Sequence, residues 1–143
     1  KQMYEMVEYV LNEVSEKKPR HLLGIGEVED LFNGVERGVD LFDCVAPTRR
    51  ARNGSLYISS YPFTLGISLS KFKTDKNPID KECLCYTCLN FSRAYLRQLY
   101  LSKEILYHNL ATIHNIYFIE NLMRQIREAI GNKRFKSLKS SWI

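Results

Sequence analysis

The first part of the chain contains two segments in which apolar residues recur every three or four positions, the spacing of one helix face. In the first segment these residues are Met3, Met6, Val7, Val10, Leu11 and Val14. In the second they are Val28, Leu31, Phe32 and Val35. Pro19 follows the first segment and Gly38 follows the second, and both residue types commonly stop helices. The pattern therefore predicts two helices in this region.

A short apolar run follows each predicted helix, at 21–25 and at 41–45. Runs of this length are typical of buried strands. Because helix and strand alternate, the two strands should be parallel neighbours in an α/β fold. Parallel sheets normally have several strands covered on both faces, so this region should belong to a larger α/β structure. The chain begins with Lys1 rather than Met, and we expect it to be the C-terminal part of a longer protein.

The pattern changes after the turn dipeptide Asn53-Gly54. Two short segments, 56–58 and 63–69, have the residue types of antiparallel strands joined by a turn. A polar stretch then leads into a cluster of cysteines. Beyond the cysteines the periodicity predicts two long helices, at about 91–108 and 115–130.

The chain as a whole is basic. The 143 residues carry a formal net charge of +5, which favours a polyanionic partner, although many proteins this basic bind none. Arg49, Arg50 and Arg52 crowd one predicted loop, at 47–54, and further basic residues gather near the C-terminus. No apolar stretch is long enough to span a membrane and no secretion signal is visible. With clustered cysteines, this composition fits the reducing cytoplasm.

Three of the four cysteines, Cys83, Cys85 and Cys88, lie within six residues of one another. Thiolates at this spacing can converge on one point about 2.3 Å from each sulfur, as zinc requires. A tetrahedral site needs a fourth ligand, and of the three histidines we choose His114, which opens an amphipathic segment. The sequence therefore predicts a structural Cys3His site that holds one zinc per chain.

Two alternatives to zinc stay open at this point. The cysteines could be buried free thiols or a disulfide pair, although a bridge between Cys83 and Cys85 would be strained. Cys44 could also join the cluster as a fourth thiolate of an iron–sulfur centre. Ligand softness and spacing favour zinc over both.

Asp43 is the candidate catalytic residue, because it stands near the end of the second predicted strand. Functional residues of parallel α/β folds gather at the carboxyl ends of strands, and a carboxylate buried among apolar neighbours is costly unless it is used or paired. Alternatively, Asp43 is structural and pairs with one of the nearby arginines or caps a turn. These arginines are either solvated or bind phosphate through their guanidinium forks.

Several segments of the chain are similar to the core of tRNA-guanine transglycosylases of the bacterial type. They occur in the family's order between about residues 19 and 130, and are Pro19–Gly26, Gly34–Gly54, Cys83-x-Cys85-x2-Cys88, Ser92–Tyr95 and His114-Asn115. The chain departs from the family's Thr-Arg-x-Gly-Arg-Asn-Gly pattern at Ala51, which should stiffen the loop.

The resemblance implies a (β/α)8 TIM barrel with a zinc-binding insertion subdomain near its C-terminus. This chain would then supply the last βα units of the barrel in 1–58, the zinc-binding subdomain in 59–114 and C-terminal helices in 115–143. In the family, the region from Phe91 onward contributes to a homodimer.

The resemblance also implies an activity, the exchange of guanine at the tRNA wobble position for a 7-deazaguanine on the route to queuosine. Asp43 matches the nucleophile of this pentosyltransferase, which forms a covalent aspartyl-glycosyl intermediate. Thr48, Arg49 and Arg52 match residues that hold the tRNA anticodon loop. The wall of the base pocket is matched by Leu23 and Gly24. The bacterial pattern suggests an aminomethyl-7-deazaguanine (preQ1) as the incoming base.

Two other classes of function compete with a catalytic enzyme. One is a non-catalytic, zinc-containing tRNA-binding subunit of the same family, although such a subunit should lack Asp43. The other is a zinc module that binds RNA by itself, which would leave apolar strand edges exposed. The general base should lie outside this chain, so we expect these residues alone to be inactive.

Overall fold

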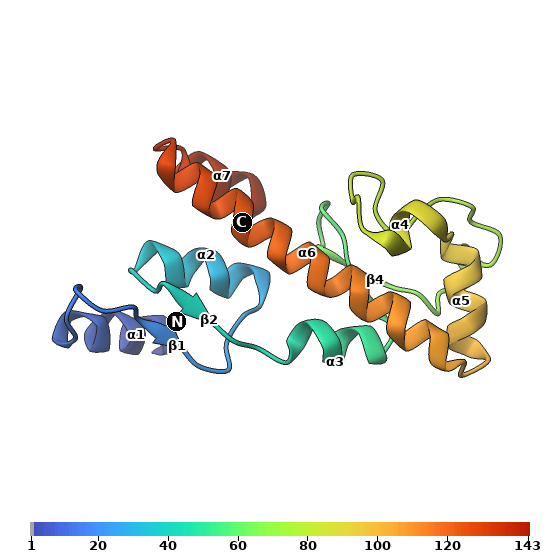
Figure 1. The fold of residues 1–143 in the computed structure, drawn as a ribbon, viewed down its shortest axis with the longest axis horizontal. Helices are drawn as coiled ribbons and strands as arrows, with labels where there is room; N and C mark the ends of the chain where they lie inside the picture. The colour runs from blue at the N-terminus through green and yellow to red at the C-terminus, as the bar shows by residue number, and fades with distance from the viewer. Residues whose placement is uncertain (1) are drawn as a thin grey trace. The chain divides into compact units, whose positions relative to one another are not determined.

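The computed structural model describes residues 2–143 and divides into two units. Unit 1 consists of Lys1–Ala46 and Met123–Ile143, and unit 2 consists of Pro47–Leu122. Helices and strands are mixed along the chain, as the sequence predicted, and Figure 1 labels them. The long helix α6 (Ile105–Gly131) contributes residues to both units. Among the described residues, no helix has the length and apolar character that a membrane crossing requires.

Unit 1 contains a pair of parallel strands. β1 (His21–Leu22) pairs with β2 (Leu41–Phe42), with His21 opposite Leu41 and Leu22 opposite Phe42. The prediction of parallel neighbours is confirmed, although each strand has only two residues and is shorter than the apolar run predicted. The helices of unit 1 besides the end of α6 are α1 (Gln2–Glu13), α2 (Val28–Glu36) and α7 (Phe135–Trp142).

Helix α2 ends where the sequence predicted, because Gly38 adopts a left-handed conformation with φ +92°. The N–H of Gly38 donates to the Val35 carbonyl and the N–H of Val39 donates to the Gly34 carbonyl. These two bonds satisfy carbonyls at the helix end in the manner of a Schellman motif. Gly34 also lies against the Phe42 ring, where an added Cβ would come within 2.8 Å of ring carbons. The missing side chain lets α2 pack closely on β2.

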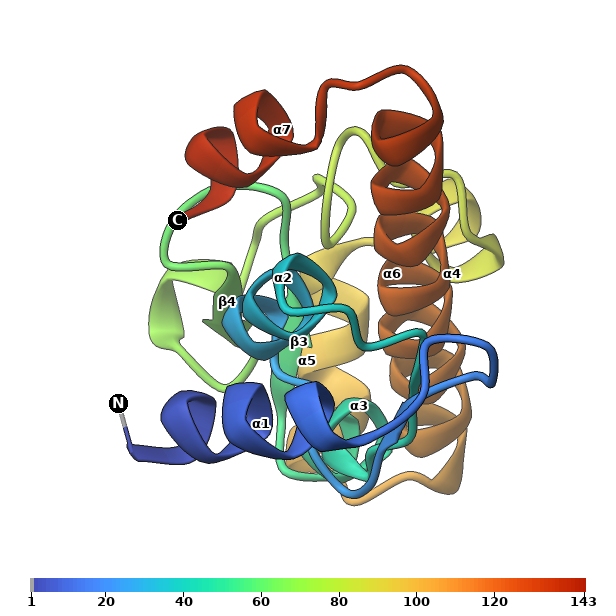
Figure 2. The same cartoon turned by 90° about the vertical axis from the view of Figure 1, so that its left-hand side faces the viewer.

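Helix α7 is fixed to α2 by aromatic and polar contacts. The fully buried Phe32 ring lies 6.2 Å from the Phe135 ring and 6.0 Å from the Trp142 ring, centroid to centroid. The Lys139 ammonium donates to Glu36 Oε2 at 2.7 Å and lies 2.8 Å from Asn33 Oδ1. This contact lowers the pKa of Glu36. Figure 2 shows α7 (red) following α6 through a turn.

Unit 2 combines a small antiparallel sheet with helices. β3 (Ser55–Tyr57) pairs with β4 (Thr64–Gly66) in antiparallel register, so the predicted hairpin is confirmed. Gly54 precedes β3 with φ +79°, and an added Cβ there would meet the Tyr100 ring at 2.8 Å. The helices are α3 (Ala46–Arg52), the 3-10 turn η1 (Ser70–Phe72), α4 (Tyr86–Asn90), α5 (Arg93–Leu101) and the first part of α6.

The polar stretch before the cysteines is held to α5 by an ion pair. Arg93 Nη1 lies 3.1 Å from Asp75 Oδ2, and the same guanidinium donates to the Ile79 carbonyl. The Asp75 carboxylate also accepts the Asn77 backbone N–H at 2.9 Å. That bond, together with Arg93, lowers the pKa of Asp75. A stretch with little apolar content is thus ordered by its charges.

Asn115 on α6 joins three elements of unit 2 from a fully buried position. Its Oδ1 accepts the Tyr57 N–H at 3.1 Å. Its Nδ2 donates to the carbonyls of Pro47 at 3.0 Å and Ser55 at 3.1 Å. A single amide therefore connects α6 to α3 and β3.

Two expectations about local structure are wrong. The predicted arginine loop is mostly the helix α3, in which Pro47 occupies the first turn and the fully buried Ala51 takes the place of a family glycine. His114 does not open a helix, because α6 begins at Ile105 and His114 lies well inside it. The break between the two long helices falls at residues 102–104, where Lys103 has φ +56°.

Candidate metal centre and candidate active site

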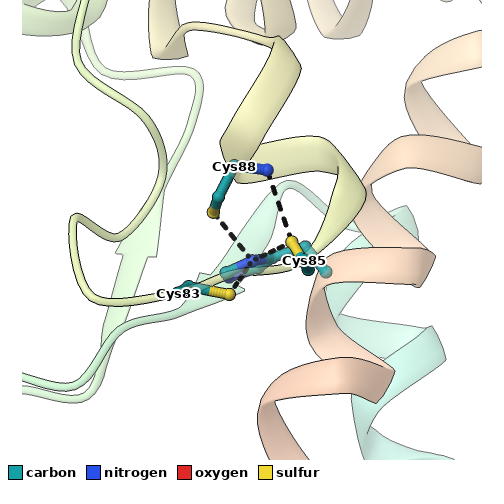
Figure 3. A group of neighbouring side chains, drawn as sticks. Cys83, Cys85 and Cys88 are labelled. Carbon is teal, nitrogen blue, oxygen red and sulfur yellow. Dashed lines mark hydrogen bonds between the residues drawn. The ribbon is translucent and has the colours of Figure 1, made fainter.

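The three clustered cysteines are arranged by the start of α4. Cys85 is the N-cap of this helix, and its Sγ accepts the Cys88 backbone N–H at 3.3 Å. This capping bond brings the Cys85 sulfur over the turn that carries Cys88, while Cys83 approaches from the preceding loop. Figure 3 shows the three cysteine side chains around the point where the dashed lines meet. Cys85 and Cys88 are buried and Cys83 is half-buried.

His114 supplies a nitrogen to this cluster from the interior of α6. Its Nδ1 lies 3.6 Å from Cys83 Sγ, 3.4 Å from Cys85 Sγ and 3.3 Å from Cys88 Sγ. The ring is fully buried, and Nε2 lies 2.8 Å from the Tyr57 carbonyl oxygen, to which it donates. A carbonyl can only accept, so Nε2 carries a proton, and Nδ1 is the ring nitrogen that faces the sulfurs and can bind a metal in the neutral ring.

The geometry fits a tetrahedral metal ion. With metal–sulfur bonds of about 2.3 Å and a metal–nitrogen bond of about 2.05 Å, a tetrahedral angle gives a sulfur–nitrogen separation of about 3.6 Å. The observed separations of 3.3 to 3.6 Å are close to this value. One imidazole nitrogen cannot form three good hydrogen bonds at once, whereas one cation satisfies all four ligands. The four ligand atoms lie within 4.8 Å of one another.

The thiols of the cluster share protons through hydrogen bonds. Bonds from Cys83 and Cys88 hold the pKa of the Cys85 thiol far below its usual value, whereas bonds with Cys83 and Cys85 raise the pKa of Cys88. A thiolate is the form of cysteine that binds metal. The Tyr57 carbonyl accepts the Nε2–H on the far side of the His114 ring and is the kind of partner that orients a metal-binding imidazole. The four predicted residues therefore form a candidate metal site.

The alternative sulfur chemistries find less support. None of the four cysteines is disulfide-bonded in the described part of the chain. Cys44 belongs to unit 1, whereas the cluster belongs to unit 2. Its Sγ accepts the Ala46 N–H at 3.2 Å at the start of α3. Cys44 therefore has a local role of its own.

Asp43 directly follows β2 and is held by β1 and the residues after it. His21 Nε2 lies 2.9 Å from Asp43 Oδ1, and the Gly24 N–H donates to the same oxygen at 3.3 Å. The Asp43 side chain is 59% exposed in this chain. The expectation of a carboxylate buried among apolar neighbours is wrong for these residues alone, and the side chain that contacts Asp43 is a histidine rather than an arginine.

Leu23 and Gly24, the predicted wall of the base pocket, lie beside Asp43 because β1 and β2 run parallel. Leu23 is 71% exposed. Gly24 has φ +73°, and an added Cβ would meet no atom within 4 Å. The Gly24 N–H donates to the Asp43 carboxylate, and there is open space beside its Cα.

Sequence reasoning considered His21 only as a possible metal ligand and missed its contact with Asp43. The two predicted parallel strands carried part of the information needed to find this contact. In the structure His21 pairs with Leu41, which brings it within two residues of Asp43. This register cannot be derived from the residues of either apolar run.

Thr48, Arg49 and Arg52, the predicted tRNA contacts, lie on α3. Arg49 and Arg52 are exposed, and a spacing of three residues puts them on the same face of the helix. Thr48 is half-buried. Arg50, which was not chosen as a tRNA contact, lies over the Tyr57 ring, 5.8 Å from its centroid.

Comparison with known proteins assigns the chain to a family. Residues 1–143 match the sequence model of the family described as queuine tRNA-ribosyltransferase. A queuine tRNA-ribosyltransferase of Aquifex aeolicus is 52% identical over 141 residues, 99% of this chain and 37% of the relative. Enzymes of the same name from Caldanaerobacter subterraneus and Thermodesulfovibrio yellowstonii are 48% and 45% identical, each over 99% of this chain and 37% and 36% of the relative. The chain thus spans somewhat more than a third of these relatives, and it belongs to the queuine tRNA-ribosyltransferase family.

Proposed function

We propose that this chain is the C-terminal part of a tRNA-guanine transglycosylase that exchanges guanine at the anticodon wobble position for a 7-deazaguanine. The observation that carries the proposal is the Asp43 carboxylate, which is exposed and is held through one oxygen by His21 and Gly24. Family membership over the whole chain supports it. In the proposed full-length protein, the earlier barrel strands supply the general base and the residues that read the base.

The proposed reaction has two displacements at the ribose C1′ of the wobble nucleotide. In the first, a lone pair of Asp43 forms a bond to C1′ while the C1′–N9 bond breaks, and its electron pair leaves with guanine, which takes up a proton from water or a general acid. In the second, the incoming 7-deazaguanine loses a proton to a general base and its nitrogen attacks C1′. The Asp43–C1′ bond then breaks and restores the carboxylate. Two displacements retain the β-linkage, as in retaining glycosidases.

An ionised carboxylate suits both steps. The transition states have oxocarbenium character, so a negative charge next to C1′ stabilises them electrostatically. Bound tRNA and the rest of the proposed barrel would exclude water from Asp43, whose side chain is exposed in this chain, and would strengthen that attraction. An amide at this position could neither carry the charge nor form the ester.

Five other residues supply recognition in this proposal. Arg49 and Arg52 project from one face of α3 and would bind phosphates of a splayed anticodon loop, together with Thr48. Leu23 offers an exposed apolar face and Gly24 offers bare backbone, which together would contact the flat base. The preferred incoming base in this proposal is preQ1.

The metal in the Cys3His site would be zinc with a structural role. Cys83, Cys85, Cys88 and His114 would fill a tetrahedral shell, which leaves no position for a catalytic water. The site joins the α4 region to α6 and so stabilises unit 2. An aromatic patch next to it, Tyr86, Phe91 and Tyr95, includes a Phe91–Tyr95 stack with 5.4 Å between centroids. We assign this patch to a homodimer contact.

The test is incorporation of labelled guanine into tRNA by the full-length protein and by its Asp43→Asn variant. Wild-type protein should exchange guanine, and Asp43→Asn should abolish exchange while it still binds tRNA. Asp40→Asn is the matched control, since Asp40 stands at the other end of β2 and should tolerate the loss of charge. Tight tRNA binding without exchange by the wild type would instead indicate a non-catalytic tRNA-binding subunit.

A further inference from the structure

Two donors of unit 1 meet the same oxygen of Asp43. His21 Nε2 lies 2.9 Å from Oδ1 and the Gly24 backbone nitrogen lies 3.3 Å from Oδ1. An ionised carboxylate can only accept hydrogen bonds, so His21 must carry a proton on Nε2. Both contacts come from β1 and the residues that follow it, and both leave Oδ2 to other partners. The two carboxylate oxygens are therefore not equivalent.

We propose that His21 is a positioning residue that holds the Asp43 carboxylate so that Oδ2, and not Oδ1, attacks the ribose. The inference rests on the proposed function, because it needs Asp43 as the nucleophile. A carboxylate rotates about its Cβ–Cγ bond unless something holds its plane. One hydrogen bond from His21 and one from Gly24 fix that plane, and pre-orientation of reacting atoms within about 1 Å affects rate by up to about 100-fold.

The same hydrogen bond has a use in the second displacement. When Oδ2 is bonded to C1′, Oδ1 is the carbonyl oxygen of the ester and keeps His21 as its donor. As the Oδ2–C1′ bond breaks, negative charge returns to the carboxylate, and a hydrogen bond to a charged group is stronger than one to a neutral group. His21 therefore favours departure of Asp43 from the sugar as well as its orientation.

The two strands stay paired without the His21 side chain. The strands already form a parallel ladder, with His21 opposite Leu41 in the backbone. A second side chain tie joins them, because the Arg20 N–H donates to Asp40 Oδ2 at 2.9 Å. The His21 side chain is 42% exposed, so its replacement opens no sealed cavity. The fold should tolerate its loss.

The test compares His21→Leu, His21→Gln and Asp40→Ala in the full-length protein, using guanine exchange with saturating and limiting tRNA. His21→Leu removes the donor and should lower kcat by about 10- to 100-fold with an unchanged KM for tRNA. His21→Gln places an amide N–H near the position of Nε2 and should restore most of kcat. Asp40→Ala removes the other strand tie and should behave as wild type. Thermal unfolding and metal content establish that each variant is folded.

The possible outcomes separate this inference from the proposed function. If wild-type protein exchanges guanine and His21→Leu keeps wild-type kcat, the positioning role is wrong and the proposed function stands. The positioning role is also wrong if Gln gives no rescue, if KM rises in place of a fall in kcat, or if Asp40→Ala loses as much activity. Absence of exchange in the wild type contradicts the proposed function itself.

Discussion

Replacement of Cys85 by serine tests the metal site most severely. Cys85 is 2% exposed, its sulfur lies 3.4 Å from His114 Nδ1, and it also accepts the Cys88 N–H that begins α4. Serine has a shorter side chain and a hydroxyl that does not ionise at neutral pH. The substitution therefore removes one metal ligand, whereas the cap of α4 can persist, because serine is itself a preferred N-cap residue.

The magnitude follows from the number of ligands. Structural zinc sites contribute about 10–16 kcal/mol of apparent binding free energy at neutral pH, so one ligand in four accounts for roughly 3 kcal/mol. Serine can cap α4 in place of cysteine, so the cap adds no further cost. We expect Cys85→Ser to destabilise the protein by about 3 kcal/mol when zinc is present.

The assay measures zinc content by atomic emission after dialysis against a chelator, together with chemical unfolding of the same samples. Wild-type protein should retain about one zinc per chain, and Cys85→Ser should retain much less and unfold at lower denaturant concentration. Cys44→Ser is the matched control, since Cys44 contacts only the start of α3 among its described hydrogen bonds. One zinc per chain in Cys85→Ser would refute the ligand set.

Three further predictions concern unit 2. Asn115→Leu replaces the amide by apolar atoms in the same branched shape and removes the three hydrogen bonds to backbone groups, so it should lower the free energy of unfolding by about 3 kcal/mol or more in denaturant titrations; a loss below 1 kcal/mol would contradict this. The pKa of Asp75 is lowered, first by the Asn77 N–H, so its stabilisation is present above the unfolded pKa of about 4 and is lost as the pH falls through the folded pKa. Asp75→Asn should therefore unfold more easily than wild type at pH 7 in thermal melts, with the difference shrinking near pH 3, and an equal difference at both pH values would count against the argument. Arg49→Ala and Arg52→Ala should each reduce the salt slope of tRNA affinity by about 0.7, and unchanged slopes would remove α3 from the proposed tRNA contacts.

The order of elements was predictable because helix and strand periodicities differ and because glycine and proline mark the ends. Gly38 ends α2 as predicted, since its φ of +92° is one that other residues rarely adopt. The segment containing Arg49 and Arg52 was predicted as a loop because it lies between a predicted strand and the turn dipeptide Asn53-Gly54. Its helical form follows from the packing of Ala51 in the core, which composition does not reveal.

The candidate site was predictable to different degrees. Cysteine spacing alone identified three of the four residues of the candidate metal site, because few other arrangements use thiols one and two residues apart. The choice of His114 was correct in that it joins the cluster, although its place in the middle of α6 was not foreseen. Asp43 was a candidate because it follows a predicted strand, and the resemblance favoured a catalytic over a structural role, which stays a prediction. Its partner His21 was missed, because a parallel register depends on backbone pairing and not on residue type.

The central claim is that Asp43 forms a covalent bond to the ribose of the wobble nucleotide. The most direct measurement is to denature the full-length protein during turnover with tRNA, digest the slow-migrating adduct and locate the sugar by mass spectrometry. The account predicts a ribosyl ester on the peptide that contains Asp43. A sugar attached to any other residue, or no adduct from a protein that exchanges guanine, would contradict it.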